Sequence, residues 1–322
     1  MTEAARQRVV FFGAGAFGLP TLGALAEACD LVAVVTQPDR RAGRGRAPAP
    51  TPIGAWADAH LDLERVLRAE SVNKPAVCDR IRELPADVWV IIAFGQKLGQ
   101  ALLADRFAIN LHASLLPRWR GAAPINAAIL AGDIETGNSV ITLADRMDGG
   151  LILGQSRRSI DPQQTAGELH DLLAADGPDL VLRVLAERAA GRLAPRTQDE
   201  SKVTIAPKLS KADGWVDFAE PASAVRRRIH GLTPWPGVTV QFRAAPLKLL
   251  RANIEPPAPK KLAPGALLDP ALGTIACGAG AIRLLEVQPA GGKPMAWSEF
   301  ARGRSPQAGE QLIGHAPAEP TS

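Results

Sequence analysis

Apolar positions in the first two-thirds of the chain form short uninterrupted runs, separated by stretches with helical spacing. The runs predict strands at 9–12, 31–36, 65–68, 88–93, 108–112, 140–143 and 151–153. The intervening pattern predicts helices over 17–28, 75–84 and 165–188, the last with a kink at its internal proline. Strands that are apolar throughout are typical of parallel strands buried on both faces. The pattern therefore predicts a doubly wound α/β sheet.

The pattern changes after about residue 190. Residues 191–207 (GRLAPRTQDESKVTIAP) are polar and bounded by prolines, which predicts a linker. Short strands are expected beyond it at 214–218, 238–242, 247–250, 274–276 and 282–287, with one helix over 222–229. Glycine and proline turns between them favour a small β-rich barrel. We therefore expect a first domain over 1–190, a linker over 191–207, a second domain over 208–314 and a tail over 315–322.

Composition narrows the class of protein. The chain has 322 residues, of which 46% are hydrophobic and 22% charged, so it can build two cores and is not a disordered protein. Its three cysteines lack metal-ligand spacing, so we expect no metal site. The longest apolar run, 88–94, is too short to span a bilayer, and the first eight residues do not resemble a signal peptide. We expect a cytoplasmic protein without membrane association, and nothing in the sequence requires more than a monomer.

The net charge of +4 is unevenly distributed. Residues 208–322 contain 14 Lys and Arg against 9 Asp and Glu, which leaves the preceding residues at −1. The first part nevertheless contains a basic loop, 37–46 (QPDRRAGRGR), whose four arginines are interspersed with glycine. Such a run is usually a solvated surface loop, but arginine also presents a planar fork that suits phosphate groups. An anionic partner is one explanation of both features.

Glycines follow the first strand in the order Gly13-x-Gly15-x-x-Gly18, which matches the dinucleotide-binding fingerprint. That fingerprint also requires an acidic residue at the end of the second strand, where this chain has Thr36 and Gln37. Binding of a nicotinamide cofactor is one interpretation. We favour the other, a tight turn at the switch point of an open α/β sheet.

The most informative stretch is 110–121, NLHASLLPRWRG. Asn110 and His112 are two residues apart at the end of a predicted strand, so their side chains share one face. An amide can donate to a developing oxyanion, and an imidazole can transfer protons near neutral pH. Asp148, on a turn after another strand, is placed to orient the histidine. A histidine at a strand end is more often structural, so the pair alone does not establish catalysis.

With these residues the chain resembles the folate-dependent formyltransferases, which share Asn-x-His, a Ser-Leu-Leu-Pro turn and a later Asp-x-Gly. It is most similar to the methionyl-tRNA formyltransferases. This narrower resemblance rests on the stretches 36–46, 118–125, 208–218 (KLSKADGWVDF), 234–237 (PWPG) and 292–295 (GKPM). The resemblance covers about residues 8–314. It implies a Rossmann-like formyltransferase domain followed by an OB-like β-barrel, with 10-formyltetrahydrofolate as formyl donor and methionyl initiator tRNA as acceptor.

The resemblance assigns roles to individual residues. It implies that the catalytic groups are Asn110, His112 and Asp148. The folate contacts that it implies are Ile92, Ala93, Phe94, Gly95, Ser114, Leu115, Leu116 and Pro117. With tRNA as the acceptor, the basic loop is expected to contact it through Arg40, Arg41, Arg44 and Arg46. The positive charge of the second part makes further candidates of Arg226, Arg227, Arg228, Lys248 and Arg251.

The chain departs from the family pattern at several of these places. It has Gly13-Ala14-Gly15 where Gly-Thr-Pro is usual, Phe94 for Tyr, Ala113 for Gly, and Gly149 for Thr. No catalytic group is lost. The first departure changes the expected contact with the amino-acid end of the acceptor.

Alternative activities remain at this stage. The same chemistry could serve a small amine such as an aminosugar nucleotide or glycinamide ribonucleotide, or could release formate by hydrolysis. A noncatalytic RNA-binding protein is an alternative of a different class. The basic loop and the +5 second part favour the tRNA acceptor, and the complete Asn110, His112 and Asp148 set favours an enzyme.

Overall fold

The computed structural model describes residues 6–41, 47–256 and 262–314. The chain divides into two compact units. The first, which we call the α/β unit, comprises Met1–Arg120, Gly137–Arg158 and His170–Thr204. The second, the β-rich unit, comprises Gly121–Thr136, Ser159–Leu169 and Ile205–Ser322.

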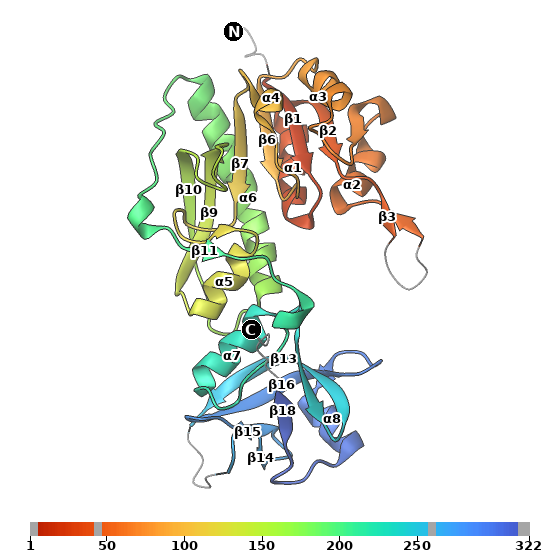
Figure 1. Ribbon diagram of the computed structural model, residues 1–322, viewed down its shortest axis with the longest axis vertical. Coiled ribbons are helices and arrows are strands. Elements are labelled where there is room, and N and C mark those ends of the chain that lie inside the picture. Colours follow the sequence, from red (N-terminus) through yellow and green to blue (C-terminus); the bar gives the residue numbers. More distant parts are fainter. Residues whose placement is uncertain (1–5, 42–46, 257–261, 315–322) are drawn as a thin grey trace, which may run out of the picture. The chain divides into compact units, whose positions relative to one another are not determined.

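A seven-stranded sheet in the order β10-β9-β7-β6-β1-β2-β5 forms the centre of the α/β unit (Figure 1). Its strands are β1 (Arg8–Gly13), β2 (Asp30–Thr36), β5 (Val66–Arg68), β6 (Val88–Ile92), β7 (Ala108–His112), β9 (Glu135–Thr142) and β10 (Ile152–Ser159). From β5 to β7 neighbouring strands are parallel, and β9 pairs antiparallel to β7. The chain builds outward from β1 to β2 and β5, then returns to place β6 on the other side of β1. The switch point therefore lies between β1 and β6.

Helices cover the sheet because its strands are apolar on both faces. The helical elements of this part of the chain are η1 (Ala16–Gly18), α1 (Leu19–Ala28), α2 (Pro52–His60), η2 (Leu63–Arg65), α3 (Pro75–Arg82), α4 (Gln100–Leu103), α6 (Ala166–Ala189) and η3 (Glu200–Lys202). On one face, Phe12 packs against Trp89 and Phe94, with ring centroids 5.2 and 5.7 Å away, and the same cluster includes Ile81 of α3 and Leu102 of α4. This aromatic cluster fixes the ends of β1 and β6, the two strands that flank the switch point.

The β-rich unit is built on a curled sheet in the order β14-β15-β16-β13-β12-β18, with β17 paired to β16. Its strands are β12 (Val238–Phe242), β13 (Ala245–Glu255), β14 (Leu267–Asp269), β15 (Thr274–Ala276), β16 (Ala281–Pro289), β17 (Met295–Ala296) and β18 (Leu312–Gly314). The helical elements are α5 (Pro124–Ala131), η4 (Lys211–Asp213), α7 (Ala222–Gly231) and α8 (Trp297–Arg304). Its core joins Ile229 of α7 and Trp297 of α8 to inward residues such as Leu249 and Leu284.

Two short ribbons pair β3 (Arg40–Arg41) with β4 (Pro48–Ala49) and β8 (Arg120–Gly121) with β11 (Ile205–Ala206).

The predicted fold class is confirmed, with an open α/β sheet followed by a small antiparallel domain. The strand predicted at 214–218 is wrong, because this stretch follows η4 as irregular chain. Arg228 accounts for the difference: its guanidinium lies 3.8 Å from the ring centre of Trp215 and donates to the carbonyls of Asp213 and Trp215. The Trp215 carbonyl, inside the predicted strand, is therefore bound by a side chain rather than by a neighbouring strand.

Some elements were missed or shortened by the sequence pattern. The helix α2 was not predicted, although Thr51 caps it by accepting from the Gly54 amide and Pro52 occupies its first position. The strands β9 and β10 extend beyond their predicted apolar centres. The helix α6 continues through Pro178. In the described ranges, no helix combines the length and apolarity needed to cross a membrane.

Candidate active site

Two of the predicted catalytic residues, Asn110 and His112, lie on β7, and the third, Asp148, approaches His112 from the turn between β9 and β10. Asn110 pairs with Ile91 of β6 on one side and Ile141 of β9 on the other, so β7 lies inside the sheet. His112, the last residue of β7, is buried, with 6% of its surface exposed. Both side chains leave the same face of one strand, and β6 separates this strand from the switch point. Open α/β sheets bind their ligands at the carboxyl ends of their strands, near the switch point.

The hydrogen bond of His112 determines how its imidazole is used. Nε2 lies 2.8 Å from the carbonyl oxygen of Trp119. A carbonyl only accepts, so Nε2 carries a proton, and Nδ1 is left facing the Asp148 carboxylate. The distance from Nδ1 to Oδ2 of Asp148 is 3.6 Å, longer than a normal hydrogen bond. The structure thus brings the predicted histidine and aspartate together with room for a small adjustment.

Asp148 is presented by a tight turn between β9 and β10. Its φ is +50°, a left-handed conformation that aspartate tolerates better than most residues. Gly150 is required two residues later, because a Cβ there would lie 1.7 Å from the carbonyl oxygen of Thr142. The Gly149 amide donates to the carbonyl of Arg146 and closes the turn. The side chain of Asp148 is 16% exposed, so it can reach a ligand.

Two buried residues that sequence reasoning did not assign to the site hold this turn. Nε2 of Gln198 donates to the carbonyls of Asp148, at 2.7 Å, and Gly150, at 2.8 Å. Its Oε1 accepts from Arg120, with Nε at 3.0 Å and Nη2 at 2.8 Å. Gln198 is 5% exposed and Arg120 is 4% exposed. Gln198 belongs to a polar stretch without apolar periodicity, so no sequence signal distinguished it from a solvated linker residue.

The glycines after β1 have a packing role. The amides of Ala14 and Gly15 approach the carbonyl of Ala93, at 3.3 and 3.2 Å. A Cβ on Gly15 would lie 3.2 Å from the Cβ of Ala93, and one on Gly13 would lie 2.5 Å from the ring of Phe11. These contacts bring the turn after β1 against the loop after β6. The close approach explains why glycine occupies these positions, as expected for a tight turn at the switch point.

The loop after β6 has two exposed residues on either side of a buried one. Ala93 and Gly95 are exposed and have φ of +46° and +75°, while the side chain of Phe94 is buried. Nε2 of Gln37 donates to the Phe94 carbonyl at 2.6 Å. Ile92, at the end of β6, is fully buried. Ala93 and Gly95 are therefore the exposed residues of the predicted folate loop, and the carbonyl of Ala93 already accepts from the amides of Ala14 and Gly15.

Hydrogen bonds of two serine hydroxyls hold the Ser114–Pro117 turn. Ser114 is fully buried, and its hydroxyl donates to the carbonyl of Arg118 at 2.6 Å. Ser139 of β9 accepts from the Leu116 amide and donates to the Ser114 carbonyl. Leu116 is buried, whereas Leu115 and Pro117 are partly exposed. The turn thus offers Leu115 and Pro117 outward.

The basic loop is described only in part. Arg40 is exposed and pairs with Ala49 in the β3–β4 ribbon, where Arg41 pairs with Pro48. Arg44 and Arg46 lie outside the described residues. Arg68 forms ion pairs with Asp39 and Asp58 at the base of this region.

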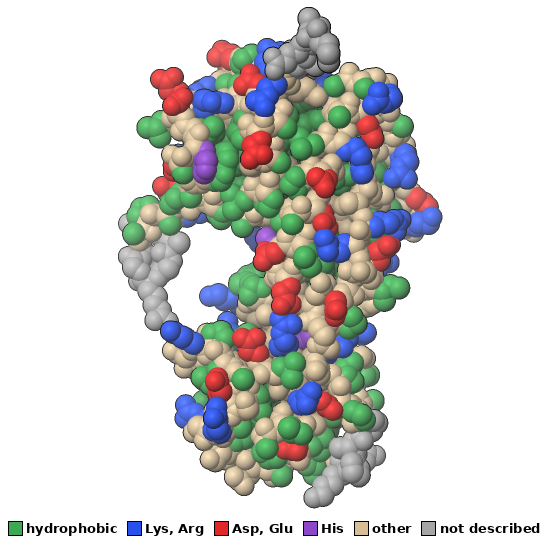
Figure 2. Space-filling model, turned by 180° about the vertical axis from the view of Figure 1, so that it is seen from behind, with side chains coloured by type: hydrophobic (Ala, Val, Ile, Leu, Met, Phe, Trp, Pro, Cys, Tyr) green, Lys and Arg blue, Asp and Glu red, His purple; other side chains and the backbone are tan. Residues whose placement is uncertain are grey.

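Basic residues predicted in the β-rich unit differ in their surroundings. Arg228 is held on Trp215, and Arg251 donates to Glu168 and to the carbonyl of Gln163. Burial and the neighbouring Arg227 lower the pKa of Arg226. Lys248 is partly exposed on β13. On the face shown in Figure 2, basic and acidic side chains are interleaved rather than gathered by sign.

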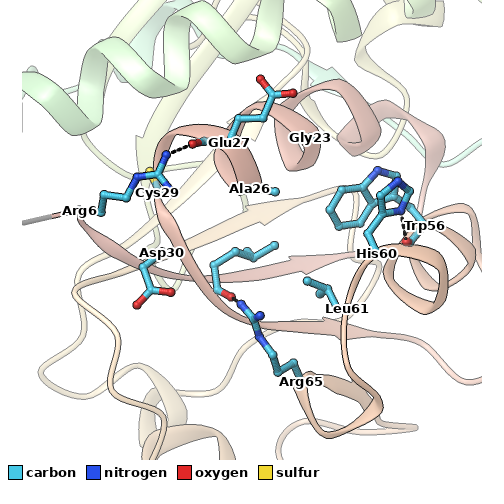
Figure 3. Close-up of a pocket in the computed structure, with 11 residues that line it drawn as sticks. Arg6, Gly23, Ala26, Glu27, Cys29, Asp30, Trp56, His60, Leu61 and Arg65 are labelled. Atoms are coloured by element: carbon cyan, nitrogen blue, oxygen red, sulfur yellow. Dashed lines mark hydrogen bonds between the residues drawn. The ribbon is translucent and has the colours of Figure 1, made fainter.

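A hollow of about 1130 Å³ lies elsewhere on the α/β unit, near the start of β2 (Figure 3). His60 stacks on Trp56 there, with ring centres 4.4 Å apart, and Arg65 donates to the carbonyls of Leu31 and Val32. None of the predicted site residues lines it. Across the described ranges, no group of three or more His, Cys, Asp or Glu side chains is arranged to hold a metal ion.

Comparison with known proteins agrees with this geometry. The formyl transferase family model matches residues 7–185, and the model of the formyl transferase C-terminal domain matches residues 208–305. The methionyl-tRNA formyltransferase of Solibacter usitatus is 41% identical over 308 residues, covering 95% of this chain and 98% of that protein. The chain belongs to the methionyl-tRNA formyltransferase family.

Another member, from Mesorhizobium japonicum, is 43% identical over 307 residues, covering 92% of this chain and 96% of that protein. Among solved structures, the N-formyltransferase from Helicobacter canadensis, crystallised with folinic acid and dTDP-3-aminofucose, has a TM-score of 0.67 at 13% identity. The matched region covers 87% of this chain and 98% of the chain of that N-formyltransferase. At that identity the likeness shows the fold. The methionyl-tRNA formyltransferase family is thus supported over both predicted domains, whose boundaries remain our prediction.

Proposed function

We propose that the protein transfers the formyl group of 10-formyltetrahydrofolate to the α-amino group of methionyl initiator tRNA. The observation that carries this proposal is the His112–Asp148 pair, held on the same strand as Asn110 in a chain from this family. The α-amino group of an esterified methionine is largely neutral near pH 7, since free α-amino groups titrate at about 8 and an ester lowers that value. An activated serine or cysteine nucleophile is therefore unnecessary.

The reaction needs charge stabilisation and one proton transfer. The amine forms a bond to the formyl carbon, and the bond from that carbon to the folate nitrogen then breaks. In between, the formyl oxygen is an oxyanion. We assign Asn110 and the Nδ1–H of protonated His112 as donors to it. Because Nε2 is already committed to Trp119, Nδ1 is the imidazole atom available to the substrate.

Asp148 completes the set. Its carboxylate stabilises the imidazolium of His112 across the 3.6 Å gap. We further assign it the proton transfer, in which it accepts a proton from the attacking amine, directly or through water, and delivers it to the leaving folate nitrogen. Each product then carries the correct number of protons, and no metal takes part in this scheme.

The proposed folate site comprises the exposed residues Ala93 and Gly95 together with the partly exposed Leu115 and Pro117. A planar heterocycle needs donors and acceptors along its edge and an apolar wall, and these residues supply both. Ile92, Phe94, Ser114 and Leu116 have buried side chains, so any part they play is through the main chain or by supporting the loops.

We propose that the acceptor tRNA is held by the basic loop and by basic residues of the β-rich unit. Arginines at 40, 41, 44 and 46 supply the first group. The second group is Arg226, Arg227, Arg228, Lys248 and Arg251. Since Arg228 and Arg251 also hold internal contacts, replacing either affects folding as well as tRNA affinity. An enzyme acting on aminoacyl-tRNA works where translation occurs, so we also propose a cytoplasmic location, and a monomer as the working form.

The test is to incubate the protein with 10-formyltetrahydrofolate and one acceptor at a time, and to follow the formyl group. Methionyl initiator tRNA is expected to be formylated, while an aminosugar nucleotide or water is not. Preferential formylation of the aminosugar nucleotide would overturn the proposed acceptor. It would favour the second candidate, an enzyme acting on small amines.

A further inference from the structure

We propose that Arg120 and Gln198 are positioning residues that set the active geometry of Asp148, and that Thr204 does the same for the His112 side of the pair. This inference rests on the proposed function for its kinetic part only. The three residues, which we call the clamp, lie within the α/β unit.

The clamp acts on Asp148 through main-chain atoms. One amide group, Nε2 of Gln198, satisfies the carbonyls on both sides of Gly149. A turn with Asp148 at φ +50° and a glycine forced against Thr142 has little tolerance for displacement. Holding two carbonyls of the turn therefore fixes the backbone position from which the Asp148 side chain extends.

Arg120 determines the orientation of Gln198. Its Nε and Nη2 both donate to Oε1 of Gln198, so the amide cannot flip without placing NH₂ against the guanidinium. Glu200 accepts from Nη1 and Nη2 of Arg120, which compensates the charge of a side chain that is 4% exposed. Hydrogen bonds from Arg120 lower the pKa of Glu200, which favours its ionised form. The guanidinium of Arg120 is therefore held in one orientation.

Thr204 acts on the other partner. Its Oγ1 accepts from the Trp119 amide at 2.9 Å, and its carbonyl accepts from the Arg120 amide at 2.9 Å. Trp119 has a φ of +61°, and its own carbonyl is the group that binds Nε2 of His112. A short stretch after α6 therefore supports the carbonyl that sets the imidazole and the turn that carries the carboxylate.

The decisive variant is Gln198→Glu. It keeps the oxygen that accepts from Arg120 but replaces the donating NH₂ by a carboxylate oxygen facing two carbonyls. The turn is then repelled while the volume is unchanged. Arg120→Lys is the second variant, because lysine cannot provide the two-pronged contact. Arg82→Ala is the matched control, since it removes three guanidinium bonds to the carbonyls of Ala101, Leu102 and Ala104 in the same unit.

We expect kcat for methionyl-tRNA formylation to fall about 10- to 100-fold in Gln198→Glu and in Arg120→Lys, with KM for the folate donor changed less than about threefold. Gln198→Asn, which keeps a side-chain amide, should lose less of kcat than Gln198→Glu. Arg82→Ala should lower the melting temperature and leave kcat within about twofold. An unchanged kcat in Gln198→Glu, or an equal loss in Arg82→Ala, would overturn the inference.

A second readout does not depend on activity. Hydrogen–deuterium exchange of the folded wild type and Gln198→Glu should show faster exchange in residues 146–151 of the variant, with β1 and β6 unchanged. If the wild type formylates no tRNA, the proposed function fails while this measurement still tests the clamp. Equal exchange in 146–151 would reject the clamp even if the wild type is an active formyltransferase.

Discussion

Nδ1 of His112 lies 3.6 Å from Oδ2 of Asp148, while Nε2 of the same ring is held at 2.8 Å by the carbonyl of Trp119. One nitrogen is therefore fixed by the fold, and the other is left for the carboxylate and the substrate. This division explains how a single histidine can be oriented and still be available for chemistry.

The first prediction concerns this pair. Asp148→Asn removes the charge that stabilises the imidazolium and the group assigned to proton transfer, so kcat should fall by about 10²–10⁴. Single-turnover formylation with saturating folate measures the chemical step directly. Near-normal turnover in this variant would show that Asp148 has another role. Circular dichroism should confirm an unchanged fold, since the side chain is partly exposed.

The second prediction concerns Gly150. Gly150→Ala places a methyl group 1.7 Å from the Thr142 carbonyl, so the turn must move. We expect a loss of about 1–3 kcal/mol in the free energy of unfolding, together with a large loss of kcat. Urea unfolding and formylation rates check both effects.

A glycine with open space around it provides the matched control. Gly23 lies inside α1, and a Cβ there would meet nothing within 4 Å. Gly23→Ala should therefore stabilise the protein by about 0.5–1 kcal/mol and leave kcat unchanged. Equal behaviour of the two alanine variants would contradict the steric argument.

The third prediction is a pH dependence of stability that originates at His230. Burial, then the charges of Arg226 and Arg251, lower the pKa of His230 to about 4. The unfolded chain, with a histidine pKa of about 6.5, binds the proton more readily between these values. The contribution is therefore complete above about pH 6.5 and is lost as the pH falls to about 4, by up to about 3 kcal/mol.

A variant isolates the histidine from other titrating groups. Nε2 of His230 accepts from the Ala252 amide, and the side-chain oxygen of a glutamine can take its place. His230→Gln should flatten the stability profile between pH 6.5 and 4, measured by urea unfolding at each pH. An unchanged slope would assign the pH dependence to other groups.

The fourth prediction tests the basic loop. The double variant Arg41→Ala/Arg44→Ala should weaken tRNA binding and reduce the slope of log K against log salt by about 2, one unit for each lost phosphate contact. Folate affinity should not change. Arg192→Ala, an exposed arginine beyond the end of α6, is the control and should leave both unchanged. An equal loss of tRNA and folate affinity would contradict the assignment.

The sequence by itself determined the strands of the α/β sheet and the neighbourhood of the catalytic residues. Runs such as 88–92 are apolar at every position because the strand is buried on both faces, and that pattern is local. Asn110 and His112 could be placed on one face from their spacing alone. Glycines 13 and 15 lie in a turn, as expected, since a Cβ would meet the ring of Phe11 at Gly13 and the side chain of Ala93 at Gly15.

Only the tertiary structure decided what the polar residues do. Gln198 and Arg120 are 78 positions apart in the chain and meet at the Asp148 turn. Arg228 binds the carbonyl of Trp215, which lies inside the strand predicted at 214–218. Apolar burial leaves a periodic signal in each element. A buried hydrogen bond leaves none, because its energy depends on a partner whose position in the sequence is unconstrained.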